Sequence, residues 1–231
     1  MKNLNVLEKK INIKFNNIDL LQQALVHRSF INEHSEFSLG HNERLEFLGD
    51  AVLEIVITEY LFLNFPNQAE GVLTNWRASL VNTKMLYQVA KNLDFEDYLL
   101  LSKGESRDKN SKARQSILAD SVEAVIGAIY LDQGMEVVKD FVLKNIISNL
   151  DQIIESKSYL DPKSRFQEVA QELRNITPSY KVLKEEGPDH AKKFTVGLFL
   201  EEELVAIGEG LSKQEAQAEA AEKGLKAKNW L

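Results

Sequence analysis

The spacing of hydrophobic residues divides the chain into two parts. Between about residues 3 and 155, apolar side chains recur with the period of a helix, as they do at Leu21, Ala24 and Leu25. Residues 102–116 interrupt this pattern and are predicted to form a polar loop, either a solvated connector or a loop that contacts phosphate groups. The first part is therefore predicted to be helical throughout.

The period changes after Pro162, which suits the first turn of a helix. The predicted elements are, in order, a helix over about 162–174, strands over 179–184, 193–200 and 204–208, and a helix from 212 to about 228. Within the second strand Phe194, Val196, Leu198 and Leu200 alternate, as one buried face of a strand should. The order α-β-β-β-α predicts a compact α+β module.

The last predicted helix has a defined start and a face of small residues. Ser212 and Glu215 have the spacing of a capping box, which fixes where the helix begins. Ala216, Ala220 and Ala221 are small enough to let the helix lie close against a sheet. We therefore expect this helix to pack on the predicted strands.

Composition narrows the class of protein only slightly. At 231 residues, with 44% hydrophobic residues, the chain suits one large domain or two of ordinary size. Its net charge of −7 argues mildly against nucleic-acid binding, unless some of the acidic side chains hold metal cations. Composition alone does not indicate an RNA-binding protein.

No segment indicates export or membrane insertion. The N-terminus lacks the apolar core of a signal peptide, and the longest apolar stretch is broken by Asp50, Glu54 and Glu59. The chain has no cysteine, which excludes disulfides and fits a reducing compartment. We therefore expect a cytoplasmic protein that does not associate with a membrane.

Acidic residues cluster on two predicted helices, over residues 41–60 and 116–130. They are Glu43, Glu46 and Asp50 in the first helix, within an arc of roughly 60° at about 100° per residue, and Asp120 and Glu123 in the second, on one face. Nearly all other positions of these helices are apolar, so we expect both helices to be buried. Ionised carboxylates in a buried helix are costly unless they are paired or bound to a metal.

A hard divalent cation is the partner that these carboxylates favour. Few basic residues lie in either helix, and the four histidines of the chain lack zinc-binding spacing. Oxygen ligands suit Mg²⁺ or Mn²⁺, which commonly serve phosphoryl-transfer chemistry. The alternative is that the acids are ordinary surface residues of amphipathic helices.

Three motifs give the chain a resemblance to a known family. The stretch 42–50, Asn-Glu-Arg-Leu-Glu-Phe-Leu-Gly-Asp, matches the signature motif of bacterial ribonuclease III, and residues 117–123 resemble the second acidic motif of that family. The C-terminal module resembles a double-stranded-RNA-binding domain, including its loop over residues 187–194. The resemblance implies two domains: an all-α endonuclease domain over 1–156, a linker over 157–161 and a small α+β double-stranded-RNA-binding domain over 162–231.

The resemblance also implies roles for individual residues of the first domain. The implied metal ligands are Glu46, Asp50, Asp120 and Glu123, of which Asp50 and Glu123 are the implied catalytic residues. Glu43 and Glu70 match secondary acidic positions of the family. Phe47 matches an aromatic side chain of the homodimer contact, although its spacing fits a core position equally well. His27 is expected to be a structural histidine.

In the C-terminal module the resemblance implies contacts with the minor groove and the phosphates of A-form RNA. The implied contacts are Gln167 and Glu168 on the first helix, Pro188 and His190 on the loop, and Lys213 at the start of the last helix. Gln214 and Gln217 stand where lysines are common in the family, and acidic residues slightly outnumber basic ones in this module. This departure puts the strength of RNA binding in question.

The predicted activity is that of a Mg²⁺-dependent endoribonuclease specific for double-stranded RNA, with Mn²⁺ able to substitute and no nucleotide cofactor. A metal-activated water would attack the phosphodiester and leave 5′-phosphate and 3′-hydroxyl ends, with short 3′ overhangs. Each chain has one acidic cluster, so cutting both strands requires two chains, and the family supplies them as a homodimer. The resemblance further implies a role in processing ribosomal and messenger RNA.

Two other functions fit part of the pattern. A catalytically idle double-stranded-RNA-binding protein would have lost acidic residues, whereas all of the implied ligands are present. An all-α nucleotide pyrophosphatase also gathers carboxylates on helices, but it has no place for the α-β-β-β-α module. An endoribonuclease accounts for both parts of the chain.

Overall fold

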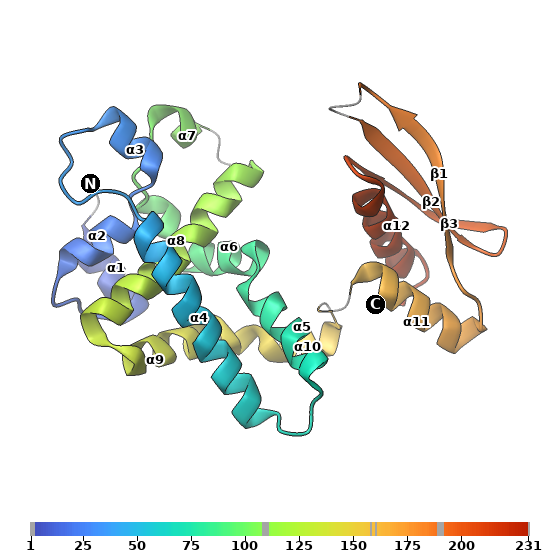
Figure 1. Ribbon diagram of the computed structural model, residues 1–231, viewed down its shortest axis with the longest axis horizontal. Coiled ribbons are helices and arrows are strands. Elements are labelled where there is room, and N and C mark those ends of the chain that lie inside the picture. Colours follow the sequence, from blue (N-terminus) through green and yellow to red (C-terminus); the bar gives the residue numbers. More distant parts are fainter. Residues whose placement is uncertain (1–2, 108–110, 158, 160, 189–191, 231) are drawn as a thin grey trace. The chain divides into compact units, whose positions relative to one another are not determined.

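The computed structural model describes residues 3–107, 111–157, 159, 161–188 and 192–230 (Figure 1). Contacts divide the chain into two compact units, Met1–Glu155 and Ser156–Leu231. Each unit has its own core and is described by itself.

The first unit is all-α in its described residues, as predicted (Figure 1). Its α-helices are α1 (Leu4–Ile11), α2 (Ile18–Ala24), α3 (Arg28–Glu33), α4 (Glu43–Asn64), α5 (Glu70–Val81), α6 (Thr83–Asn92), α7 (Lys103–Arg107), α8 (Lys112–Gln133), α9 (Met135–Asn145) and α10 (Leu150–Ser156). Short 3-10 turns, η1 (Phe95–Asp97) and η2 (Ile147–Asn149), lie between them. No helix in the described part of the chain is long and apolar enough to cross a membrane.

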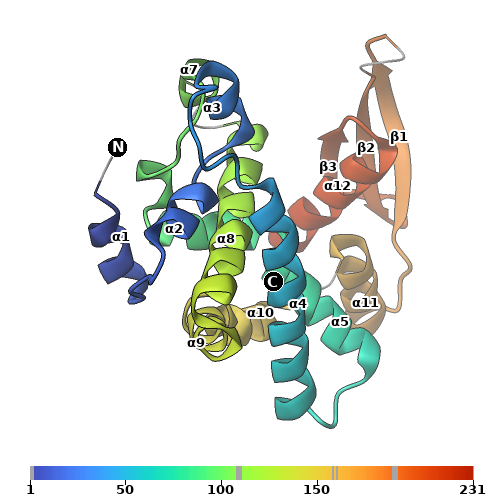
Figure 2. The same ribbon diagram turned by 60° about the vertical axis from the view of Figure 1, so that its left-hand side comes forward.

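Helix α8 runs through the centre of the first unit and crosses α4 (Figures 1 and 2). Val122, Val125, Ile126 and Ile129 are fully buried, because α2, α4, α6 and α9 pack around the helix. A helix that is apolar on nearly every side is stable only when it is covered in this way. The prediction of a buried helix is therefore confirmed for α8.

Helix α4 is covered on one side only, so the prediction of a buried helix is wrong for α4. Leu53 and Ile57 lie in the core. On the other side, the exposed fractions of the large apolar side chains are 83% for Phe47, 55% for Ile55, 70% for Phe62 and 66% for Leu63. Periodicity shows where apolar residues stand without showing what covers them, and in the single chain this face is open to solvent.

The predicted polar loop over 102–116 is partly helical, because it contains α7 and the first turns of α8. Two serines explain these helices. The hydroxyl oxygen of Ser102 accepts a hydrogen bond from the N–H of Glu105 (3.2 Å), and that of Ser111 accepts one from the N–H of Arg114 (3.1 Å). Such bonds satisfy the free N–H groups at a helix start. Residues 108–110 lie outside the described residues.

The second unit has the predicted α-β-β-β-α order (Figure 1). Its elements are α11 (Pro162–Arg174), β1 (Ser179–Glu186), β2 (Lys193–Leu200), β3 (Glu203–Gly210) and α12 (Lys213–Ala227). The strands form one antiparallel sheet in the order β1-β2-β3. The carboxylate of Asp161 accepts a hydrogen bond from the N–H of Ser164 (3.2 Å) and caps α11.

Helices α11 and α12 cover one face of this sheet (Figure 1). The buried core between them consists of Phe166, Ala170, Leu198, Leu200, Ala220, Ala221 and Leu225. A Cβ atom on Gly208 of β3 would lie only 2.2 Å from the carbonyl oxygen of Ala216, so α12 lies close against the sheet, as predicted. The hydroxyl oxygen of Ser212 accepts a hydrogen bond from the N–H of Glu215 (3.1 Å) and so caps α12. The other half of the predicted capping box differs, because the Glu215 carboxylate accepts from the N–H of Leu211 (2.9 Å) rather than from that of Ser212.

Candidate metal centre

The backbones of α4 and α8 nearly touch where the two helices cross. A Cβ atom on Gly49 would lie 1.7 Å from the carbonyl oxygen of Glu123, and one on Gly127 would lie 2.3 Å from the carbonyl oxygen of Leu45. Only glycine allows so close an approach. Because Glu46 stands one turn before Gly49, and Glu123 one turn before Gly127, the crossing brings these two carboxylates together.

Three of the predicted ligands form a group that could hold one cation. Glu46 of α4 and Asp120 and Glu123 of α8 each offer a carboxylate oxygen, and these oxygens lie within 4.8 Å of one another. All three residues are half-buried. Asp50 is exposed and stands outside this group, one turn after Glu46 on the same helix. Its charge nevertheless raises the pKa of both Glu46 and Glu123.

The electrostatics of the cluster favour the binding of protons or a cation. Burial, with the charges of Asp50, Asp120 and Glu46 in support, raises the pKa of Glu123 to about 8. Burial and the neighbouring carboxylates likewise raise the pKa of Glu46 to about 7, and burial raises that of Asp120. Within the described residues, no lysine, arginine or histidine forms an ion pair with any member of the group of three. Protons or a cation must therefore neutralise it.

The two secondary acids lie outside this cluster. The Glu43 carboxylate is 3.0 Å from a guanidinium nitrogen of Arg28 and 3.7 Å from Nδ1 of His41, so it forms an ion pair with Arg28. Glu70 begins α5, where its carboxylate accepts a hydrogen bond from the hydroxyl of Thr74 (3.1 Å). Both residues thus stand outside the group of three, although the charge of Glu43 is among the causes that raise the pKa of Glu46.

His27 has the structural role that its sequence context predicted. Its imidazole Nδ1 accepts from the N–H of Ser29 (3.3 Å) and caps α3. The backbone N–H of His27 donates to the carbonyl oxygen of Leu100 (3.0 Å). Burial lowers the pKa of the imidazole, so the ring caps the helix in its neutral form.

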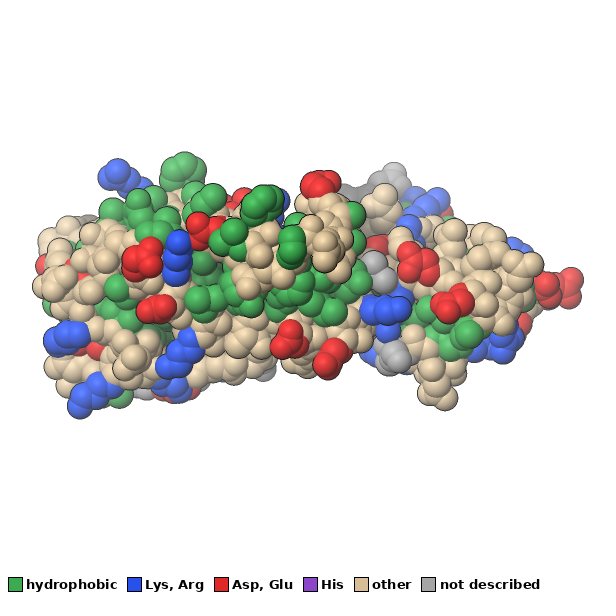
Figure 3. Space-filling model, turned by 90° about the horizontal axis from the view of Figure 1, so that it is seen from below, with side chains coloured by type: hydrophobic (Ala, Val, Ile, Leu, Met, Phe, Trp, Pro, Cys, Tyr) green, Lys and Arg blue, Asp and Glu red, His purple; other side chains and the backbone are tan. Residues whose placement is uncertain are grey.

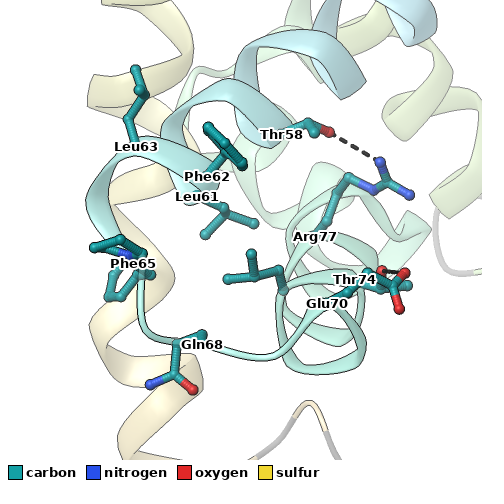
Figure 4. A pocket seen from close by; sticks show the side chains of 11 residues that line it. Thr58, Leu61, Phe62, Leu63, Phe65, Gln68, Glu70, Thr74 and Arg77 are labelled. Carbon is teal, nitrogen blue, oxygen red and sulfur yellow. Dashed lines mark hydrogen bonds between the residues drawn. The ribbon is translucent and has the colours of Figure 1, made fainter.

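Phe47 lies outside the core, which removes one of its two predicted roles. Towards the other end of α4 is a hollow of roughly 650 Å³, lined mainly by apolar side chains of α4, α5 and the turn between them (Figure 4). Thr58, Glu70 and Arg77 add polar atoms to its wall. Hydrophobic side chains also gather on the surface of this unit in the space-filling view (Figure 3). This apolar surface is a candidate interface.

The predicted RNA-contacting residues that the structure describes lie on the two helices of the second unit or just beyond the end of β1. Gln167 and Glu168 are exposed on α11 and line a shallow hollow. Pro188 is exposed beyond the end of β1, and His190 lies outside the described residues. Lys213 is exposed in the first turn of α12. Gln167 and Glu168 are neighbours on α11, whereas Pro188 and Lys213 lie on other segments of the unit.

Sequence reasoning missed some residues that shape the site. Gly49 and Gly127 set the spacing of the helices, and the signal was a glycine one turn after an acidic residue in each apolar helix. Arg28 was missed as the partner of Glu43, because nothing in the sequence places α3 beside the start of α4. In the second unit, sequence reasoning also missed the hydrogen bond that Nζ of Lys163 donates to the side-chain oxygen of Gln217 (3.2 Å).

These features define a class of protein: a helical domain with a carboxylate centre suited to a divalent cation, joined to a small α-β-β-β-α module. Residues 17–150 match the family model "Ribonuclease-III-like", and residues 162–228 match "Double-stranded RNA binding motif". The chain belongs to the ribonuclease III family, whose members are endoribonucleases that act on double-stranded RNA. The predicted family and fold class are thereby confirmed.

Individual relatives cover nearly the whole chain. Ribonuclease 3 of Clostridium tetani is 43% identical over 95% of this chain and 92% of its own length, and ribonuclease 3 of Enterococcus faecalis is 41% identical over 96% and 95%. Among solved structures, the nuclease domain of ribonuclease III from Campylobacter jejuni has a similar fold, with a TM-score of 0.57 and 43% sequence identity. The match covers 64% of this chain and 98% of that chain. That structure is described as showing flexibility in a region involved in dimer formation.

Proposed function

We propose that this endoribonuclease depends on Mg²⁺, with Mn²⁺ able to substitute, and that its ligands are Glu46, Asp50, Asp120 and Glu123. The observation that carries the proposal is the group of three carboxylates on α4 and α8, which has no basic partner among the described residues. Asp50 completes the set because it stands one turn from Glu46 and its charge is felt by both glutamates. Oxygen ligands from carboxylates suit these hard cations.

The chain's own residues hold the reacting groups rather than attacking the RNA. Held by these carboxylates, a cation would supply the activation of a water for in-line attack on phosphorus and the stabilisation of the departing oxygen. Asp50 and Glu123 are the proposed catalytic residues. Glu43, which forms an ion pair with Arg28, acts at a distance on the charge of the site. Cleavage in this way leaves 5′-phosphate and 3′-hydroxyl ends, with short 3′ overhangs.

The proposed active form is a homodimer built on the exposed apolar face of α4. In a twofold interface the same surface of both chains packs together. If two α4 helices pack antiparallel, Phe47 near the start of one reaches the hollow beside Thr58 near the end of the other, about 16 Å along the helix axis. Phe47 is then the dimer contact, and Glu70 on the wall of the hollow comes near the partner's carboxylates.

The proposed division of labour places chemistry in residues 1–156 and shape recognition of the RNA in residues 162–231, with 157–161 as linker. Gln167, Glu168, Pro188 and His190 would meet the minor groove, and Lys213 the phosphates. The exposure of the described members of this set supports their role. Processing of ribosomal and messenger RNA in the cytoplasm is the proposed setting.

The test is cleavage of long double-stranded RNA by the full chain, with single-stranded RNA and duplex DNA as control substrates. We expect cutting in Mg²⁺ or Mn²⁺, none in excess EDTA, and products that carry 5′-phosphates. Glu123→Gln should abolish cutting, whereas Glu136→Gln, which removes one exposed charge on α9, should not. Undiminished cutting in EDTA would refute the cation, and duplex binding without cutting under any condition would identify an idle binding protein.

A further inference from the structure

One carboxylate of the second unit is shared between two lysines. Glu185 lies near the end of β1, and one of its carboxylate oxygens is 3.0 Å from Nζ of Lys213 in the first turn of α12. The other oxygen is 3.7 Å from Nζ of Lys192, just before β2. The Lys213 ammonium also lies over the ring of Phe194, 5.4 Å from its centroid. Glu185 thus lies within ion-pair distance of two lysines, of which Lys213 is the nearer.

The sheet register places Glu185 on the side of the sheet that faces α12. Glu185 lies directly opposite Phe194 on β2, and residues opposite each other point to the same face. Lys213 contacts that ring from α12. The next residue, Glu186, lies opposite Lys193 and points to the other face. The two neighbouring glutamates therefore have different surroundings.

We propose that Glu185 competes with the RNA for Lys213 and Lys192. Its carboxylate pairs with these lysines until a phosphate of the duplex replaces it. The proposal rests on the RNA-binding role proposed above for the second unit. Carboxylate and phosphate oxygens are the same kind of acceptor for a lysine ammonium, so they compete for it. The ion pair is accessible, since the side chain of Glu185 is 37% exposed and that of Lys213 is 56% exposed.

The chemistry of the pair makes Glu185 an opponent of binding. Its hydrogen bond with Lys213, followed by the charges of Lys213 and Lys192, lowers the pKa of Glu185, so the carboxylate stays charged at neutral pH. When a phosphate binds Lys213, this negative charge remains on the order of 6 Å away, where repulsion in water weakens binding about threefold. A ligand must therefore carry enough negative charge to outcompete Glu185 for Lys213. This requirement favours an RNA duplex over a ligand with few charges.

Glu185→Gln in the full chain tests the proposal, because glutamine keeps the shape and loses the charge. Binding of a plain RNA duplex is measured in EDTA, so that cleavage does not interfere, at several salt concentrations. We expect about threefold tighter binding at low salt, a smaller gain as salt rises, and a slope of log affinity against log salt that steepens by up to about one. Glu186→Gln is the matched control: it makes the same change in net charge on the other face of β1, where Glu186 pairs with Lys184 (2.7 Å).

Further variants separate competition from a structural role. In a Lys213→Gln background the gain from Glu185→Gln should shrink, because the main contested cation is gone. Glu185→Asp, which keeps the charge, should leave affinity close to that of the unchanged chain. Weaker binding by Glu185→Gln would show that Glu185 positions Lys213 for the RNA, and an equal gain from Glu186→Gln would reduce the effect to net charge; either result overturns the proposal. Failure of the unchanged chain to bind any duplex would refute the proposed function itself.

Discussion

Single carboxyl groups of the acidic cluster titrate near neutral pH, and this sets how the site exchanges protons for a cation. The pKa of Glu46 is raised to about 7 and that of Glu123 to about 8, in both cases chiefly by burial. Without a cation, the pair therefore carries protons at neutral pH. A divalent cation must displace these protons, because it binds the ionised form of each carboxyl group.

Binding of Mn²⁺ should therefore strengthen as pH rises from about 6 to 9, with release of protons. Titration calorimetry without RNA, in buffers of different ionisation enthalpy, measures both the affinity and the protons released. Glu123→Gln should weaken binding and remove the part of the pH dependence above pH 7. An affinity that does not change with pH would place the cation elsewhere in the chain.

The same shift predicts how stability depends on pH. The folded pKa of Glu123, about 8, lies above the ordinary glutamate value of 4.5. Between these two pH values the folded chain holds a proton that the unfolded chain releases, so stability falls as pH rises from 4.5 to about 8. Glu123→Gln should raise the free energy of unfolding of the metal-free protein little at pH 5 and by about 1–2 kcal/mol near pH 8–9, with solvent screening allowed for. Chemical denaturation across this range measures the difference, and Glu136→Gln should show no such trend.

Among the elements, the crossing of α4 and α8 decides the geometry of the site. Gly49→Ala would drive a methyl group into the carbonyl oxygen of Glu123, so the helices must move apart. We expect a loss of about 1–3 kcal/mol or more in the free energy of unfolding and weaker Mn²⁺ binding. Gly71→Ala is the control, since a Cβ atom there meets nothing within 4 Å and alanine favours a helix. If both variants behaved alike, the close crossing would not govern the site.

The helices and strands also show which features the sequence could predict and which it could not. Periodicity predicted α11, the three strands and α12 to within a few residues, because each has its own turn and cap signals. It also placed Glu46, Asp120 and Glu123, which the structure brings together. It failed on the exposed side of α4, since an apolar residue looks the same whether its own chain or another covers it. The contact of Glu185 with Lys213 was equally out of reach, because it depends on how α12 lies on the sheet.

At the scale of the whole molecule, the second unit holds most of its positive charge in internal ion pairs. Lysines on its strands and helices face glutamates in the pairs Lys184–Glu186, Lys193–Glu209, Lys223–Glu219, Lys226–Glu222 and Lys228–Glu203. Few cations in its described part are then left for phosphates, so the affinity of the unit for RNA must rest largely on shape.

A chain that ends after residue 156 should therefore lose much of its affinity for duplex RNA while it keeps the helical fold and the acidic cluster of the first unit. We expect residual cleavage at low salt, because non-specific attraction to the phosphates strengthens there. Binding and cleavage titrations of the shortened and full chains, at two salt concentrations, measure this. If the shortened chain bound duplex RNA as tightly as the full chain, recognition would have to be assigned to the first unit.

The touching backbones at Gly49 and Gly127 also bear on which ions the centre could discriminate by size. Mg²⁺ takes ligands at about 2.0–2.1 Å in a strict octahedron, whereas Ca²⁺ takes more ligands at about 2.3–2.6 Å. A larger ion would need the carboxylates to spread, and the two helices that carry them are already fixed by contact between main-chain atoms. The lack of a side chain at Gly49 and Gly127 would thus limit the radius of the ion that fits between the carboxylates. The centre would then favour Mg²⁺ over Ca²⁺ even where calcium is plentiful.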